Sequence, residues 1–189
     1  MDFLEKDLET IIYETAQNKE GRMKLSERGL EIRGKLLRQV RIGTYGIADL
    51  ITVEINRHKD SEHINITIYE LKKGVLNLDA LTQASRYETG IRRFIEQNYY
   101  DEDIHFLTVN IILIGRSVEY NGDFLFLLNK CIDSGDVDVY TYSYDIDGLK
   151  FERQYSGWNI AEEGFEPLVA DFHKIGFTDA KQMLGALDK

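Results

Sequence analysis

The sequence predicts an α/β domain in which helices flank a mixed central β-sheet. Apolar residues recur at helical spacing over 2–17 and 77–97, and they alternate with polar residues over 47–56 and 64–72. A continuous apolar run follows at 105–114, as in a central strand that is buried on both faces. Both periodicities occur along one chain, which indicates helices packed against a sheet.

The elements are expected in the order α-β-β-β-α-β-α-β. The first helix has an apolar stripe through Leu8 and Ile12, and the polar, basic segment after it reads as a connector containing Gly21 and Gly29. Asn77 is a suitable N-cap for the longest helix. Strands are expected at 36–42, 47–56, 64–72, 105–114, 137–144 and 150–155, and helices at 2–17, 77–97, 123–131 and from Thr178.

Composition narrows the class of protein. One proline in 189 residues argues against a Pro-rich linker, and the length suits a single domain over 1–189. The lone Cys131 excludes an intramolecular disulfide and a multi-cysteine zinc site. No apolar stretch reaches the roughly 20 residues that cross a bilayer, and the chain starts with an acidic amphipathic segment rather than a signal peptide. We therefore expect a cytoplasmic protein with no membrane partner.

Charge is unevenly distributed along the chain. The whole molecule carries a formal charge of −10, yet residues 19–41 hold eight basic residues against three acids. Residues 98–147 hold two basic residues against ten acids. The first segment would suit a nucleic-acid surface, but a solvated basic stretch is the more common explanation, and charge alone does not decide.

Two strands place charges at the end of an aliphatic face. Alternation puts Asp49 on one face with the isoleucines and valine of 47–56, and Glu70 and Lys72 on one face with the isoleucines of 64–72. If the hairpin loop is centred between residues 59 and 60, Asp49 and Glu70 lie opposite each other, with Cβ atoms about 4.5–5.5 Å apart. Two partly buried carboxylates at this spacing need a proton or a cation between them, and an oxygen-only pair suits Mg²⁺ or Mn²⁺.

Further polar residues belong to the two helices. Glu5 flanks the apolar stripe of the first helix and would enter the cluster if that helix covers the aliphatic face of the hairpin; Glu9 is the second choice. In the helix after Gly74, Gln83 and Tyr87 are one turn apart and are expected near Lys72, with Arg86 facing outward.

Each of these residues also has an ordinary structural explanation. Asp49 and Glu70 would serve equally as exposed strand-end acids, with Lys72 in a surface salt bridge, and the spacing is short and common. Taken alone, Glu5 is most simply a solvated helix residue and Tyr87 a core aromatic. What favours a metal site is the agreement of all these charges on one face, at one edge of the sheet.

Four segments together resemble a known group of enzymes. They are FLEKDLE (3–9), RQVRIGTYGIADLI (38–51), IYELKKG (68–74) and ALTQASRY (80–87). This set resembles the PD-(D/E)XK, or restriction-endonuclease-like, nuclease superfamily, and within it the branch with a RecB-type Q-x-x-x-Y element that includes the NucS-type endonucleases. The resemblance covers roughly the first half of the chain, and the second half has no motif that we can place.

The resemblance implies a restriction-endonuclease-like αβββαβ core over about residues 1–115, with residues 116–189 as an α/β elaboration. It implies Mg²⁺-dependent (or Mn²⁺-dependent) hydrolysis of phosphodiester bonds in DNA. By position, the metal would be held by Asp49, Glu70 and Leu71, and Lys72 would assist the attacking water. Glu5 would be the helix acid, and the auxiliary pair would be Gln83 and Tyr87. Gln39 is a weaker match to a glutamine of the family. Ala48 precedes Asp49 where the family name has proline, a substitution that the superfamily accepts.

Partners follow from the same interpretation. Nucleic acid, with DNA as the expected substrate, would be held by the basic residues Arg33, Lys35, Arg38, Arg41, Lys73 and Arg86, with Arg92 and Arg93 as further candidates. Two alternatives stay open: a non-catalytic nucleic-acid-binding or assembly module that retains the fold, and a protein-interaction domain whose acidic second half binds a basic partner. A sheet edge or apolar patch would allow a homodimer, which no residue specifies.

Overall fold

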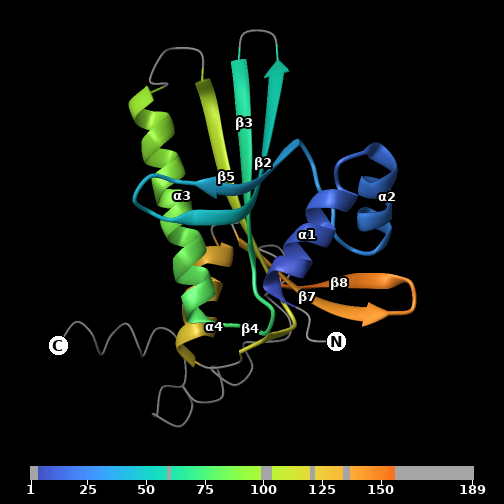
Figure 1. The fold of residues 1–189 in the computed structure, drawn as a ribbon. Helices are drawn as coiled ribbons and strands as arrows, with labels where there is room; N and C mark the ends of the chain where they lie inside the picture. The colour runs from blue at the N-terminus through green and yellow to red at the C-terminus, as the bar shows by residue number, and fades with distance from the viewer. Residues whose placement is uncertain (1–3, 59–60, 99–103, 120–121, 134–136, 156–189) are drawn as a thin grey trace, which may run out of the picture. The chain divides into compact units, whose positions relative to one another are not determined.

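The computed structural model describes residues 4–58, 61–98, 104–119, 122–133 and 137–155, which belong to one compact unit within Met1–Gly157 (Figure 1). Its elements are α1 (Glu5–Thr15), α2 (Lys19–Glu27), β1 (Lys35–Arg41), β2 (Ile47–His58), β3 (Ser61–Leu71), β4 (Val75–Leu76), α3 (Leu78–Asn98), β5 (Ile104–Gly115), β6 (Ser117–Val118), α4 (Gly122–Asp133), β7 (Val137–Asp145) and β8 (Gly148–Tyr155). The helix expected from Thr178 lies outside the described residues. No helix among those described is both long enough and apolar enough to cross a membrane.

The main sheet has six strands in the order β1-β2-β3-β5-β7-β8. β5 pairs in parallel with β3 and β7, and the remaining pairs are antiparallel. β4 and β6 form a small second sheet. The central position of β5 explains its continuous apolar sequence, because Val109, Ile111 and Leu113 are buried on one side and Ile114 on the other. The prediction of a mixed α/β fold with flanking helices is confirmed.

Helices cover both faces of this sheet. α3 packs on β5, β3 and β2, whereas α1 and α2 lie on the opposite side (Figure 1). Leu8 and Ile12 of α1 share a core with Leu50, Tyr69 and Leu71. The condition on which Glu5 was expected to enter the cluster, that α1 covers the face bearing Asp49, is therefore not met. Near this end of the hairpin both faces are apolar, so strand alternation alone did not distinguish which face each helix covers.

The hairpin register agrees with the expected one. Leu50 pairs with Tyr69 and His58 with Ser61, so the turn is centred between residues 59 and 60. The strands run closer to this turn than the expected bounds of 47–56 and 64–72, because β2 extends to His58 and β3 begins at Ser61. The face of the hairpin that carries Asp49 is called the Asp49 face. It consists of Asp49, Ile51, Val53 and Ile55 of β2 and Ile64, Ile66, Ile68 and Glu70 of β3.

The segment expected as a connector after α1 contains a helix instead. Asn18 caps α2, accepting a hydrogen bond from the Gly21 amide at 2.8 Å. Only Gly21 and Leu25 of this helix are buried, so it shows no apolar stripe in the sequence. Arg22 then donates to the carbonyl oxygens of Ala16 and Gly34, at 2.8 and 2.7 Å, which holds the connection between α1 and β1.

Candidate active site

Asp49 and Glu70 meet at the edge where β2 begins and β3 ends. The ladder pairs Leu50 with Tyr69, and continuing it by one residue places Asp49 opposite Glu70. Oδ2 of Asp49 accepts a hydrogen bond from the Leu71 amide at 3.0 Å, at the point where the backbone ladder stops. Asp49 is partly buried and Glu70 is fully buried, with no exposed surface. The structure therefore brings together the two carboxylates that the sequence analysis paired.

One oxygen of Glu70 has no partner. Oε1 accepts a hydrogen bond from Nζ of Lys72 at 2.6 Å. Oε2 is buried and bonds to nothing, and among the described residues it is the only buried side-chain nitrogen or oxygen in that condition. Leaving a carboxylate oxygen dry and unpaired is costly, and a proton or a cation would remove that cost.

The protonation of both acids reflects this crowding. Burial raises the pKa of Glu70 to about 7, and the negative charge of Asp49 adds to the effect while the bond from Lys72 opposes it. Burial also raises the pKa of Asp49 to about 6, against the opposing Leu71 amide and with the charge of Glu5 adding to the rise. For Lys72, burial favours the neutral amine, but the bond to Glu70 and the surrounding acids raise its pKa on balance.

The expected auxiliary pair does reach Lys72. Nζ of Lys72 donates to Oε1 of Gln83 at 3.4 Å, and Nε2 of Gln83 donates to the Tyr87 hydroxyl at 2.7 Å. Tyr87 is buried beneath the β1–β2 turn, where a Cβ added to Gly46 would lie 2.9 Å from Cε1 of Tyr87. α3 and this turn therefore fix a polar chain that ends at the lysine.

The two acids of α1 have different surroundings. Glu9 is buried and forms an ion pair with Arg38, which also donates to Oγ1 of Thr10 at 2.8 Å and lies 5.5 Å from the centroid of the Tyr13 ring. Glu5 is half-buried, and its Oε2 accepts a hydrogen bond from the Lys73 amide at 3.3 Å. After the larger effect of burial, the charge of Glu5 raises the pKa of both Asp49 and Glu70, whereas the charge of Glu9, which is paired with Arg38, adds a smaller rise to the pKa of Asp49.

Gln39 joins the site more directly than the sequence indicated. Its Nε2 donates to a carboxylate oxygen of Glu9 and, at 3.5 Å, to Oδ1 of Asp49. Its φ of 50° is positive, and it is the only non-glycine residue of the described ranges with that conformation. Backbone strain of this kind persists where surrounding contacts enforce it. Gln39 thus links the buried acid of α1 to the strand that carries Asp49.

The segment after Glu70 is held by residues that the sequence analysis did not single out. The Lys72 amide donates to the Ile114 carbonyl at 2.8 Å, and the Arg116 amide donates to the Gly74 carbonyl at 2.7 Å. The Tyr142 hydroxyl of β7 donates to the Lys73 carbonyl at 2.7 Å. No motif marks Tyr142, so only the parallel pairing of β5 with β7 reveals its role.

The oxygen atoms at this edge fit a hard divalent cation. Asp49 and Glu70 supply carboxylates, and the Leu71 carbonyl points to the same side as the Leu71 amide that bonds to Asp49, because both groups of one residue in a strand point the same way. Within the described ranges no three His, Cys, Asp or Glu side chains converge as a ready cluster. Mg²⁺ does not require three, because it is commonly held by one or two carboxylates and retains several waters.

Some of the predicted nucleic-acid-binding residues lie near this edge. Arg41, Lys73 and Arg86 all have exposed side chains. Arg41 pairs with Ile47, two residues before Asp49, and Lys73 follows Lys72 directly. Burial raises the pKa of Tyr87, and the hydrogen bond from Gln83 opposes that rise; Arg86 precedes Tyr87 directly on α3.

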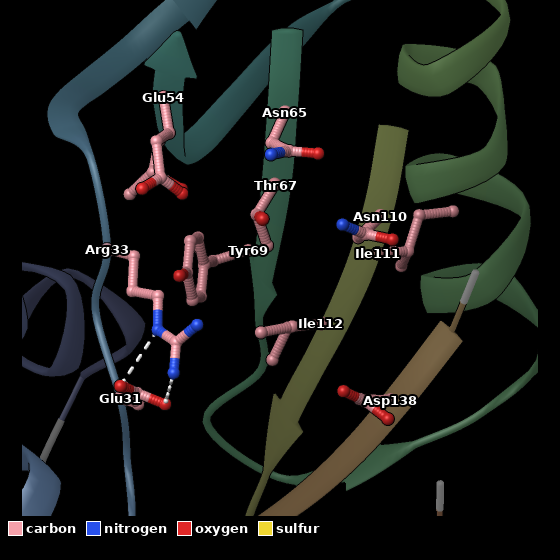
Figure 2. A pocket seen from close by; sticks show the side chains of 11 residues that line it. Glu31, Arg33, Glu54, Asn65, Thr67, Tyr69, Asn110, Ile111, Ile112 and Asp138 are labelled. Atoms are coloured by element: carbon pink, nitrogen blue, oxygen red, sulfur yellow. Dashed lines mark hydrogen bonds and ion pairs between the residues drawn. The ribbon is translucent and has the colours of Figure 1, made fainter. Parts of the chain in front are cut away.

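The remaining predicted cations are elsewhere or already paired. Arg33 lies on the face of the sheet opposite the Asp49 face, beside Tyr69 in a polar cavity of about 350 Å³ (Figure 2). It donates to both carboxylate oxygens of Glu31, at 2.8 and 3.0 Å. Lys35 pairs with Val53 away from the site, and Arg38 is bound to Glu9. Lys24 and Arg28 also form ion pairs, so the basic segment 19–41 does not present one continuous basic surface.

Comparisons with protein-family models, with curated proteins and with solved structures found no match for this chain. The candidate site consists of the buried Glu70 and the partly buried Asp49 with Lys72, the hydrogen-bonded pair Gln83 and Tyr87 from α3, and Glu5 from α1.

Proposed function

We propose that this protein is a Mg²⁺- or Mn²⁺-dependent nuclease that hydrolyses phosphodiester bonds in DNA, built on a restriction-endonuclease-like core. The order α1, β1, β2, β3, α3, β5 supports that core, with α2 and β4 as additions. The observation that carries the proposal is the unpartnered Oε2 of Glu70, buried opposite Asp49 and next to Lys72. A folded protein that keeps such an atom dry has a reason to bind a cation there.

The roles of the residues follow from their environments. Asp49, Glu70 and the Leu71 carbonyl would hold the ion. When bound, the ion supplies a Lewis acid that polarises a phosphate and lowers the pKa of a water molecule. Lys72 keeps its proton because its pKa is raised, so it acts as a hydrogen-bond donor that orients water and stabilises negative charge on phosphate oxygens. Gln83 and Glu70 fix the position of its ammonium group.

Substrate binding would rest on the exposed cations at this edge. Arg41, Lys73 and Arg86 are exposed and belong to β1, to the segment after β3 and to α3, respectively. Contacts of this kind to backbone phosphates are independent of sequence and weaken as salt concentration rises. The overall charge of −10 opposes long-range attraction of DNA, so we expect binding to be much stronger with the divalent cation than without it.

The test is divalent-dependent cleavage of single-stranded, duplex and branched DNA. Glu70→Gln and Lys72→Ala should each lose most of the activity, whereas the exposed β8 variants Glu152→Gln and Lys150→Ala serve as matched controls that retain it. Cleavage retained by both site variants would place the chemistry elsewhere in the chain. Salt-sensitive DNA binding that is unchanged by Mn²⁺ and by Asp49→Asn would instead indicate a non-catalytic binding module.

A further inference from the structure

A large apolar groove lies on the same face of the sheet as the candidate site, at the other end of the strands. It runs between the C-terminal half of α3 and the strands β1, β2 and β3, and it has a volume of about 1220 Å³. Its lining includes Leu37, Val53, Ile55, Ile64, Ile91 and Phe94.

The groove leaves large side chains in water. Ile55 is 52% exposed and Phe94 is 56% exposed. Contiguous exposed apolar surface is uncommon on folded proteins and marks sites of interaction. Burial of this lining would be favourable by about 25 cal/mol per Å² of apolar area, so the surface favours an apolar partner.

The charged residues of the groove indicate the charge of the partner. Arg41 and Arg93 contribute to its lining, and no acid does among the described residues that line it, although the chain carries a net charge of −10. Nη1 of Arg93 donates to the Tyr45 hydroxyl at 2.8 Å, a neutral group that orients the guanidinium without neutralising it. The polar lining residues Thr44, Gln97 and Asn98 are also uncharged. A partner with carboxylates beside its apolar surface would be complementary.

The shape and chemistry of the lining favour a helix. Most of the apolar lining residues are aliphatic, which suits the leucine-like side chains of an amphipathic helix better than flat nucleobases. The stretch of α3 that forms one wall, Gly90 to Asn98, spans about 12 Å, or roughly two helical turns. A second copy of this chain bound symmetrically would bring its own Arg41 and Arg93 to the interface, where like charges repel.

We propose that this groove binds an acidic amphipathic helix of a partner protein, with apolar residues at i, i+3, i+4 and i+7 in the groove and acids against Arg41 and Arg93. The inference does not depend on the nuclease proposal. The β1–β2 turn separates the two sites, since a Cβ on Gly90 would lie 2.7 Å from Ile42 Cγ2 and from Tyr45 Cδ2. A docked helix would therefore lie beside the carboxylate pair without covering it, and Arg41 is the residue that the two sites share.

The test uses a synthetic, fluorescently labelled 18-residue peptide with Leu at the i, i+3, i+4 and i+7 positions and Glu elsewhere. A second peptide has Lys in place of every Glu. Anisotropy is measured with the full chain, without divalent cation or nucleic acid. We expect the acidic peptide to bind with a Kd of about 1–100 μM and more weakly as salt rises, and the basic peptide to bind at least about tenfold more weakly.

Variants locate the binding. Ile55→Asp should weaken the acidic peptide by at least about tenfold, and Arg41→Glu with Arg93→Glu should do the same and remove the salt dependence. Ile55 is half exposed, so its substitution leaves the fold intact, which circular dichroism checks. Ile146→Asp, on the fully exposed β7–β8 turn, and Lys150→Glu are the matched controls and should bind as the native chain does.

Three results would overturn the proposal. The first is equal binding of the acidic and basic peptides, or no binding of either at millimolar concentration. The second is displacement of the acidic peptide by a single-stranded oligonucleotide with the same dependence on Ile55, which would assign the groove to nucleic acid. The third is a dimer in sedimentation velocity that Ile55→Asp dissociates, which would assign the groove to a second copy of the chain.

Discussion

The two ends of the Asp49 face differ in an unexpected way: the charged end is buried and the aliphatic end is exposed. At one end Glu70, a charged residue, has no exposed surface, while at the other end Ile55, an aliphatic residue, is 52% exposed. Both residues lie on neighbouring strands of one hairpin and on one face. In ordinary folding the aliphatic end would be buried and the carboxylate solvated. This reversal at both ends of one face is the common basis of the two proposals above, a cation at one end and an apolar partner at the other.

The largest expected effect concerns the buried carboxylate. Glu70→Gln keeps the shape and one oxygen acceptor but removes the charge, so DNA cleavage should fall by on the order of 100- to 1,000-fold, measured under single-turnover conditions with Mn²⁺. The same variant should not lose thermal stability without divalent cation. If cleavage persists, the buried Glu70 has a structural role only and takes no part in cleavage.

The second prediction concerns pH. The folded-state pKa values of Glu70 and Asp49, about 7 and about 6, lie above their ordinary values of 4.5 and 3.8, so the folded protein binds protons more tightly than the unfolded chain. The stability from this difference is fully present at acidic pH and is lost as pH rises from about 4 to 7. Without divalent cation we expect the unfolding free energy to fall by on the order of 2–4 kcal/mol over that range, as measured by urea denaturation.

Two comparisons sharpen this test. Mn²⁺ should restore the lost stability at pH 8, because it replaces the proton, and Asp49→Asn should largely abolish the restoration. Glu70→Gln should flatten the pH dependence, whereas Glu152→Gln, on exposed β8, should leave it as in the native chain. If the unfolding free energy of the native chain does not change with pH, burial raises the pKa of neither carboxylate.

The boundary between the two ends can be disturbed at a single glycine. Gly46 has a φ of +127°, and a Cβ there would lie 2.9 Å from the Tyr87 ring. Gly46→Ala should therefore cost about 1–3 kcal/mol of stability and lower cleavage by displacing the Tyr87–Gln83 pair. Gly43→Ala, in the same turn at φ +50° with open space around it, is the control and should cost less and leave cleavage unchanged. Equal costs would mean that the contact with Tyr87 does not matter.

The smallest expected effect is at the exposed apolar end. Ile55→Ala should change the unfolding free energy by less than about 1 kcal/mol, because half of the side chain is already in water. Ile51→Ala, four residues earlier on the same face and 3% exposed, should cost about 2–5 kcal/mol. A large loss for Ile55→Ala would show that the groove is filled within the chain itself.

Much of this arrangement follows from short-range pattern. Strand alternation and the turn centre correctly paired Asp49 with Glu70, because register in a hairpin is a local property. The helical spacing of Gln83 and Tyr87 correctly indicated that both reach toward Lys72. Glu5 was placed at the right edge, although α1 covers the other face.

What the sequence did not predict depends on tertiary packing. α2 was missed because it buries little apolar surface, and its existence relies on an Asn18 cap and on Arg22. Arg38 was expected to bind nucleic acid but is bound by Glu9, a pairing between residues 29 positions apart that no local pattern shows. The exposed groove also escaped notice, since Ile55 and Ile64 have the same alternation as the buried isoleucines.

The bond from Tyr142 to the Lys73 carbonyl has a consequence for the newborn chain. The tyrosine is synthesised 69 residues after the lysine that it secures, from a strand that adds to the sheet beside β5. While the ribosome is still translating that interval, Asp49, Glu70 and Lys72 exist without one of the bonds that hold their loop. The order of translation thus delays this hydrogen bond of the Lys73 loop until β7 has emerged from the ribosome.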